Sequence, residues 1–434
     1  MLLLILLHAC FYLFRLASSS IMTAPPLSAL IVAFDSVYDL SLLANTLSDE
    51  GVDATLIVPN YAAGDLYNNL IDVEVLQLDV NIDKSMHADT RALEMCDSFF
   101  RDEQVLSKIR EFQPTFVIFP ALRHDGCLLP FVRHIESIPV IWVGDPDEEL
   151  YAFECTGVAL PIHSGGFWSR LSTSFAGKSI FSNTKSNYLA PALRLATKYL
   201  PDINIDLDHL YSDVHLVLWG ADTVLRSNFA SLTQSLIEIG CHHCRGPHPL
   251  PGDLQKPLVE HRLGYSRTRV VLSHCGDTEF LEAAFHGTPM ICLPRDTHES
   301  LNAGRAVELG FARSTETTGD YTSAEEIANI VHEIHESAAY RESGRKVSLA
   351  IRDRLNPPSD RLLYWLRYIA RTKTDKTKFH KAKSQVRTLT EDIQFFVGLL
   401  VGIIFGVVCT GSAVVARYLL TTNKTQRSKG RYTR

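Results

Sequence analysis

The sequence lacks an excess of positive charge. Its 434 residues include 42 lysines and arginines against 49 aspartates and glutamates, which is a formal net charge of −7 at pH 7. Proteins that bind nucleic acid concentrate basic side chains against the phosphate backbone. We therefore expect no nucleic acid among the general partners of this chain.

The cysteines show no pattern of a disulfide framework. Of the nine, Cys10 and Cys409 lie in apolar segments at the two ends, and the other seven are scattered and odd in number. Cys241-His242-His243-Cys244 with His248 invites a zinc site, but no second C-x-x-C and no H-x-x-x-H pair lies nearby. We therefore expect neither a disulfide-stapled fold nor a bound metal.

Long apolar runs occur only near the two ends. Residues 1–14 are nearly all apolar and precede Arg15 and the small run at 17–20, which is typical of a secretory signal peptide, with an uncleaved anchor as the alternative. Residues 395–416 carry no charge and are long enough to cross a bilayer as one helix. The last segment, residues 417–434, holds six lysines and arginines and no acid. We expect a single-pass protein of the endoplasmic reticulum membrane, with its bulk in the lumen and this tail in the cytosol.

Between the ends, short apolar runs alternate with helical stripes. The spacing predicts strands at residues 30–34, 54–58, 73–78, 115–119 and 140–143, and helices at 40–50, 92–112 and 128–135. Strands separated by helices indicate a parallel, doubly wound sheet. Residues 214–219 continue the pattern, and the dense prolines of residues 246–252 mark an extended linker.

The most strongly patterned stretch is residues 271–305. An apolar strand at 270–273 leads into the tight turn His274-Cys275-Gly276, a helix at 277–285 and a second strand at 290–293. Such a βαβ unit binds phosphates at the N-terminus of its helix. A purely structural crossover without a ligand is the alternative.

The residues of this stretch resemble the donor-binding signature of the UDP-glycosyltransferases, the two-domain GT-B enzymes that include the UDP-glucuronosyltransferases. The matching residues are His274-Cys275-Gly276, Glu282-Ala283, Gly287-Thr288-Pro289-Met290, Pro294 and Asn302-Ala303-Gly304-Arg305. Residues 47–51 resemble a helix end of the family's acceptor domain, and residues 340–371 resemble its closing helices. The resemblance implies an α/β fold of GT-B type, with two Rossmann-type doubly wound domains, the second incomplete, and a C-terminal transmembrane helix.

The same resemblance divides the chain and assigns a donor site. We expect a signal peptide (1–20), an acceptor-binding domain (21–236), a linker (237–260), a partial UDP-sugar-binding domain (261–371), a juxtamembrane segment (372–394), the transmembrane helix (395–416) and the basic tail (417–434). The implied donor-binding residues are His274, Gly276 and Thr278 at the phosphates, Glu282 at the ribose, and His298 and Glu299 at the sugar. UDP-sugar is the donor substrate, and no other cofactor is implied.

Family members place a general-base histidine after the first strand and an aspartate that orients it after the fourth. These positions fall near Ser36 and Ala121, where the sequence has neither residue type. His124-Asp125 lies close by, and we expect it to be a solvated loop pair. The sequence therefore predicts that no catalytic residue of the family is retained.

The C-terminal half also departs from the family near residues 261–270. The segment that would grip the uracil is missing there, and Glu279 replaces a small hydroxyl residue beside the phosphates. Two hypotheses stay open. One is a transferase that moves a hexosyl or glucuronosyl group from a UDP-sugar to a small lipophilic acceptor. The other is an inactive member, either a partner of active paralogues or an incomplete gene model. The sequence favours no detectable transfer, and homo- or hetero-oligomers with paralogues are left open.

Overall fold

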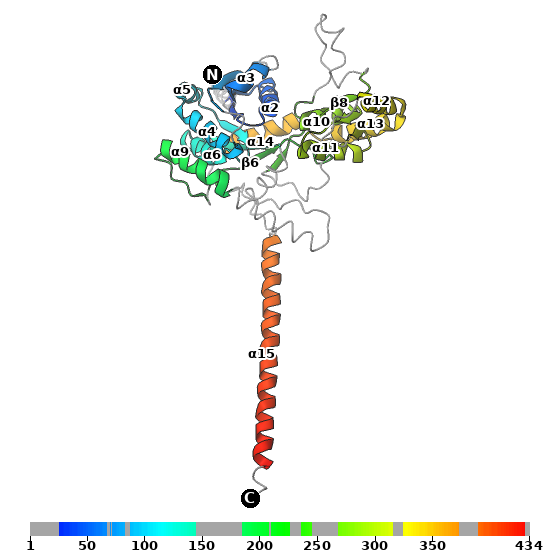
Figure 1. Ribbon diagram of the computed structural model, residues 1–434. Helices are drawn as coiled ribbons and strands as arrows, with labels where there is room; N and C mark the ends of the chain where they lie inside the picture. Colours follow the sequence, from blue (N-terminus) through cyan, green and yellow to red (C-terminus); the bar gives the residue numbers. More distant parts are fainter. Residues whose placement is uncertain are drawn as a thin grey trace, which may run out of the picture.

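The computed structural model shows two parallel sheets, a helix that crosses between them and one long C-terminal helix (Figure 1). The structure describes residues 26–66, 70, 72–82, 87–144, 185–207, 210–225, 236–244, 268–315, 324–372 and 389–429. The predicted signal peptide, most of the linker and the gap at 261–267 lie outside these ranges.

The N-terminal half is built on a seven-stranded parallel sheet in the order β3-β2-β1-β4-β5-β6-β7. Its strands are β1 (Ser28–Val32), β2 (Asp53–Pro59), β3 (Glu74–Leu78), β4 (Phe116–Pro120), β5 (Ile138–Val143), β6 (Leu216–Trp219) and β7 (Leu236–Glu238). The strand order reverses between β1 and β4, which is where open α/β sheets bind ligands beyond the carboxyl ends of their strands. The predicted doubly wound fold is confirmed, and β7 is a strand at the start of the expected linker.

Helices cover both faces of this sheet. They are α2 (Val37–Asp49), α3 (Asn60–Leu66), α4 (Ala88–Arg101), α5 (Glu103–Phe112), α6 (Asp125–His134), a π-helical turn (Lys185–Leu189) and α9 (Ala190–Tyr199). One buried cluster joins α4, α5, α6 and α9 to one face, and a second joins α2 to the other. The single helix predicted over 92–112 is broken at Asp102, whose carboxylate accepts the backbone N–H groups of Gln104 and Val105 and so caps α5.

The C-terminal half contains a smaller parallel sheet in the order β10-β9-β8. It consists of β8 (Val271–Ser273), α10 (Asp277–His286), β9 (Met290–Cys292), α11 (Thr297–Glu308) and β10 (Ala312–Ser314), followed by α12 (Ala324–Glu336) and α13 (Ala338–Arg352). Gly287 has a φ of 69°, and a Cβ on Gly344 would lie 2.6 Å from the Gly287 carbonyl oxygen. Glycine at both positions lets α13 pack closely on the end of α10. The predicted βαβ unit is confirmed.

Helix α14 (Pro358–Thr372) returns to the N-terminal half. Leu362, Leu363, Leu366 and Ile369 are buried in the same cluster as α2. Two ion pairs hold the crossing from β6 and β7: Arg354 with Asp222, and Arg361 Nη1 with Glu238 Oε2 at 3.3 Å. Burial, and then the nearby charge of Arg361, lower the pKa of Arg354 to about 10.

The chain ends in α15 (Leu389–Lys429), which extends away from the rest of the molecule (Figure 1). Its segment Val397–Leu419 is long and apolar enough to cross a membrane, and none of its most apolar stretch is buried within the protein. This fits the span predicted for residues 395–416 and a membrane anchor.

The expectation that the cysteines form no disulfide framework is wrong. Three disulfides join Cys96 to Cys127, Cys241 to Cys244, and Cys275 to Cys292. The number of cysteines away from the two ends is odd because it includes Cys155, which lies outside the described residues, and the other six form the three pairs. Two of the bridges join elements that only the fold brings together, since α4 meets α6 and the turn after β8 meets β9.

Candidate functional site

The segments that follow β1 and β4 meet at the carboxyl end of the N-terminal sheet. Asp35 follows β1, and His124 precedes α6. His124 Nε2 lies 3.0 Å from Asp35 Oδ2, and Arg123 Nη1 lies 3.9 Å from the same oxygen. The expectation of a solvated loop pair is wrong, because His124 and Asp125 are 2% and 0% exposed. An acid and a histidine therefore pair beside the two positions, Ser36 and Ala121, where the sequence showed no catalytic residue.

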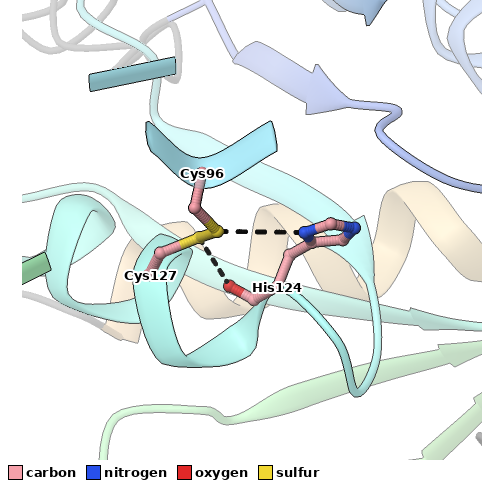
Figure 2. Close-up of side chains that lie close together, drawn as sticks. All are labelled: Cys96, His124 and Cys127. Carbon is pink, nitrogen blue, oxygen red and sulfur yellow. Dashed lines mark hydrogen bonds between the residues drawn. A yellow bond between two sulfur atoms is a disulfide. The ribbon is translucent and has the colours of Figure 1, made fainter. Parts of the chain in front are cut away.

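The imidazole of His124 is enclosed on its other sides. Phe34 packs edge-on against it, with ring centroids 5.1 Å apart. Its Nδ1 faces Cys96 Sγ at 3.9 Å, and Cys127 Sγ lies 3.2 Å from its carbonyl oxygen (Figure 2). The ring thus has Nδ1 against the disulfide and Nε2 against Asp35, and it holds the Asp35 carboxylate in place. Of the pair, Asp35 is therefore the residue that a ligand can contact.

Cys96, His124 and Cys127 bring their ligand atoms within 4.8 Å of one another, as a metal site would (Figure 2). Both sulfurs, however, are joined in one disulfide. A metal ion needs the thiolate form of cysteine, so it could bind here only after reduction. Cys241 and Cys244, which the sequence analysis considered as zinc ligands, are also joined in a disulfide and could bind a metal ion only after reduction.

Asp125 fixes the turn that carries His124. Its carboxylate oxygen Oδ2 accepts the Leu122 backbone N–H at 3.0 Å and the Tyr211 hydroxyl at 2.6 Å. Leu122 has a φ of 91°, a conformation that side chains rarely adopt and that the surrounding contacts must maintain. Burial raises the pKa of Asp125 to about 6. This buried carboxyl therefore acts on the shape of the turn and not on a ligand.

Asp35 is ionised at neutral pH. Burial raises its pKa, but the hydrogen bond from His124 and the charges of His124, Arg123 and Arg91 outweigh that effect, so the net pKa is lowered. Its side chain is 42% exposed. A carboxylate in this state can accept a hydrogen bond, and then a proton, from a ligand hydroxyl.

Asp35 faces a cavity of about 640 Å³ within the N-terminal half. The cavity is bounded by the segments that follow β1 to β4 and by the first turns of α4. Its polar lining includes Tyr61, Arg91 and Arg123, and Met95 and Ile82 supply apolar walls. The size suits a small organic ligand. The sequence analysis missed Arg91 and Tyr61, because neither lies in a motif.

The predicted donor residues gather around the N-terminus of α10. Gly276 is the N-cap of that helix, and His274 donates from Nδ1 to the Leu293 carbonyl oxygen at 2.8 Å. Thr278 donates its hydroxyl to Asp39 Oδ1 of α2 at 2.7 Å. The turn that the sequence predicts to bind phosphate therefore lies against the N-terminal half, and Asp39 contacts it directly.

Carboxylates crowd this helix N-terminus. Asp277 Oδ2 lies 2.7 Å from His298 Nε2, and Asp277 Oδ1 accepts from Asn302 at 2.9 Å. Burial raises the pKa of Asp39 to about 6, with the charges of Asp277 and Glu279 adding to the rise. Acids are favourable at a helix N-terminus, but they oppose a diphosphate at the same place.

The other predicted donor residues have protein partners. Glu282 is 37% exposed, and its Oε1 lies 3.9 Å from His243 Nε2. Glu299 is nearly buried, and both of its oxygens accept from Arg295, at 2.7 Å from the guanidinium and 2.6 Å from the backbone N–H. Glu299 is therefore bound to Arg295 at the start of α11. His298, in contrast, lies beside the turn before α10, because it contacts Asp277.

Comparisons with known proteins agree on one class. Residues 258–426 match the family model described as "UDP-glucoronosyl and UDP-glucosyl transferase". UDP-glucuronosyltransferase 2B33 of Macaca mulatta is 27% identical over 140 residues, which is 31% of this chain and 23% of that protein. UDP-glucuronosyltransferase 2A1 of Homo sapiens is 25% identical over 201 residues, 41% of this chain and 35% of that protein. The match thus spans well under half the length of these relatives.

Solved structures define the fold. A UDP-glucosyltransferase from Polygonum tinctorium superposes with a TM-score of 0.54 at 14% identity, covering 80% of this chain and 100% of that one. The glycosyltransferase VinC gives a TM-score of 0.51 at 13% identity, with the same coverage. The chain has the GT-B fold. Its residues 258–426 are similar to the UDP-glycosyltransferase family, and parts of the chain are similar to UDP-glucuronosyltransferases.

Proposed function

We propose that the protein transfers a sugar from a UDP-sugar to a hydroxyl of a small acceptor bound beside Asp35. The observation that carries this proposal is the Asp35–His124 pair at the cavity, 3.0 Å apart. From the sequence alone, the missing histidine and aspartate favoured an inactive protein. The pair supplies the same two chemical groups in exchanged positions, with the acid after β1 and the histidine after β4.

The exchange changes which group meets the substrate. In the proposed reaction the acceptor hydroxyl gives its proton to the Asp35 carboxylate as its oxygen bonds to the anomeric carbon. The bond from that carbon to the UDP oxygen breaks, UDP leaves, and the configuration inverts. The acceptor proton becomes more acidic as the new bond forms, so a carboxylate can take it within the same step. His124 positions Asp35 and stabilises its charge by donating from Nε2.

We further propose that the donor diphosphate binds at the N-terminus of α10, where the helix dipole and free N–H groups favour anions. His274, Gly276 and Thr278 surround that turn, and Glu282 follows one turn later on α10. The carboxyl of Asp39 must be neutralised or displaced for the diphosphate to approach. We keep His298 and Glu299 as proposed sugar contacts, which would require Glu299 to leave Arg295.

The cellular placement completes the proposal. We infer that α15 anchors the protein in the endoplasmic reticulum membrane, with residues 21–394 luminal and 417–434 cytosolic. The support is the apolar segment Val397–Leu419 and the signal-like start of the chain. Protease added to intact microsomes should trim only the C-terminal tail, and loss of the luminal part would contradict this orientation.

The test of function is a transfer assay on membranes that contain the full chain. Radiolabelled UDP-glucose, UDP-galactose and UDP-glucuronate are offered with a panel of phenols. We expect turnover above mock membranes and a loss of about 10²–10⁴-fold in rate for Asp35→Asn, the usual effect of removing a general base. Asp53→Asn, an exposed acid at the amino end of β2, is the matched control and should keep full activity. No turnover with any donor would favour the inactive hypothesis.

A further inference from the structure

The cavity beside Asp35 carries more positive than negative charge. Arg91 of α4 and Arg123 line it together with the single carboxylate of Asp35. Arg123 Nη1 is 3.9 Å from Asp35 Oδ2, whereas Arg91 makes no ion pair within 4 Å with any residue that the structure describes. The two arginines and the one carboxylate sum to about +1 in a partly enclosed space, which favours an anion.

The guanidinium of Arg123 also has unused hydrogen-bonding capacity. Its Nε is buried and has no hydrogen-bond partner within the described part of the chain. A buried donor without a partner is costly, and a ligand that supplies an acceptor removes that cost. Arginine suits a carboxylate because its planar N–H groups match the two carboxylate oxygens.

The remaining walls suit a flat apolar group. Val80, Ile82, Ala92 and Met95 line the cavity, and Tyr61 adds an aromatic side chain that is 63% exposed. A ring between these side chains would bury apolar area and stack on or against Tyr61. The cavity thus combines an apolar slot with two cations and one proton acceptor.

Resting on the proposed function, we propose that the acceptor is an aromatic hydroxy acid. Its ring lies in the apolar slot, its hydroxyl meets Asp35, and its carboxylate is held by Arg91 with Arg123 beside it. The carboxylate adds a charge to the small lipophilic acceptor that the family resemblance implies. Arg91 becomes the residue that selects acids over neutral phenols.

The experiment compares 4-hydroxybenzoate with its methyl ester, which keeps the ring and the hydroxyl but has no charge. For the full chain in membranes, we expect kcat/KM for the acid to exceed that for the ester by about tenfold or more, as a charged hydrogen bond allows. Arg91→Met should remove this preference by lowering kcat/KM for the acid, mainly through KM, and should lower kcat/KM for the ester much less. Arg91→Lys should restore part of it.

Arg101→Met is the matched control on the same helix, because Arg101 pairs with Asp97 and does not line the cavity. Equal or better turnover of the ester by the unmodified protein would overturn the inference and leave the proposed function standing. If neither these two compounds nor any phenol of the panel is turned over, the proposed function fails, and calorimetry with the same two compounds still decides the inference. Tighter binding of the acid that Arg91→Met abolishes would support it, and equal binding of acid and ester would overturn it.

Discussion

The two halves of the molecule differ in completeness and in charge. The N-terminal half has a seven-stranded sheet and a cavity lined by two arginines and one aspartate. The C-terminal half has a three-stranded sheet, and carboxylates surround the helix end where a diphosphate is expected. A complete sheet gives the N-terminal half a preformed cavity at the carboxyl ends of its strands. The turn at the N-terminus of α10, which is predicted to bind the donor phosphates, is surrounded by carboxylates that would repel such an anion.

Two of the disulfides offer the largest test of this contrast, because Cys96–Cys127 lies in the N-terminal half and Cys275–Cys292 lies in the C-terminal half. Replacing Cys96 and Cys127 by alanine should lower the free energy of unfolding by about 3–4 kcal/mol, since the bridge closes a loop of 31 residues. It should also weaken acceptor binding, because the bridge packs against His124. Thermal unfolding of the solubilised protein and acceptor calorimetry measure the two effects.

The matched variant replaces Cys275 and Cys292, whose bridge spans 17 residues in the C-terminal half. It should lose slightly less stability and should weaken UDP-glucose binding and not acceptor binding. If both double variants weakened the binding of the same ligand, the proposed assignment of the acceptor to the N-terminal half and of the UDP-sugar to the C-terminal half would be wrong.

The second test concerns α14, which follows the C-terminal half and packs on the N-terminal sheet. It asks whether this packing stabilises the protein. Leu366 is fully buried between α14 and the N-terminal sheet, so Leu366→Ala should cost about 2–5 kcal/mol of unfolding free energy. Leu349→Ala, at a residue that is 60% exposed on α13, should change stability by less than about 0.5 kcal/mol. Denaturant unfolding compares them. Similar midpoints would mean that α14 contributes little to the N-terminal core.

The role of His124 is a smaller but sharper test within the N-terminal half. Because His124 acts through Asp35, His124→Gln should lower kcat about 10–100-fold, as expected for a lost charged hydrogen bond, and change KM little. It should also raise the pKa of Asp35, so the acidic limb of the pH–rate profile should move to higher pH. An unmoved acidic limb would show that His124 only packs there.

The smallest expected effect concerns Asp39 at the donor turn. Its pKa of about 6 lies above the ordinary 3.8, so the carboxyl is largely neutral at pH 5 and charged at pH 7.5. UDP-glucose keeps a constant diphosphate charge over that range. Its affinity should therefore fall as pH rises through 6, by roughly 1 kcal/mol or fivefold, because the newly charged Asp39 adds one repulsion. Calorimetry at the two pH values measures this change. Asp39→Asn should flatten the dependence, and a variant that keeps it would assign the effect to another group.

Several features follow from the sequence by itself. The alternation of apolar runs and helical stripes predicts the parallel sheet, the stretch from residue 271 to 305 predicts the βαβ unit, and the uncharged run near the C-terminus predicts the apolar helix. Each signal is local, because it depends on side-chain periodicity or hydropathy within about 20 residues. For that reason it can be recognised without knowing which strands become neighbours.

Only the tertiary structure decided the candidate site. Asp35 and His124 are 89 residues apart and meet because β1 and β4 pair in parallel, an adjacency that no local pattern records. His124-Asp125 reads as polar loop sequence, yet both side chains are buried once α6 packs on the sheet. The disulfide beneath His124 and the arginines of the cavity likewise depend on where α4 lies. Pairing between distant segments is set by the packing of the whole sheet, and the chemistry of this site depends on that pairing.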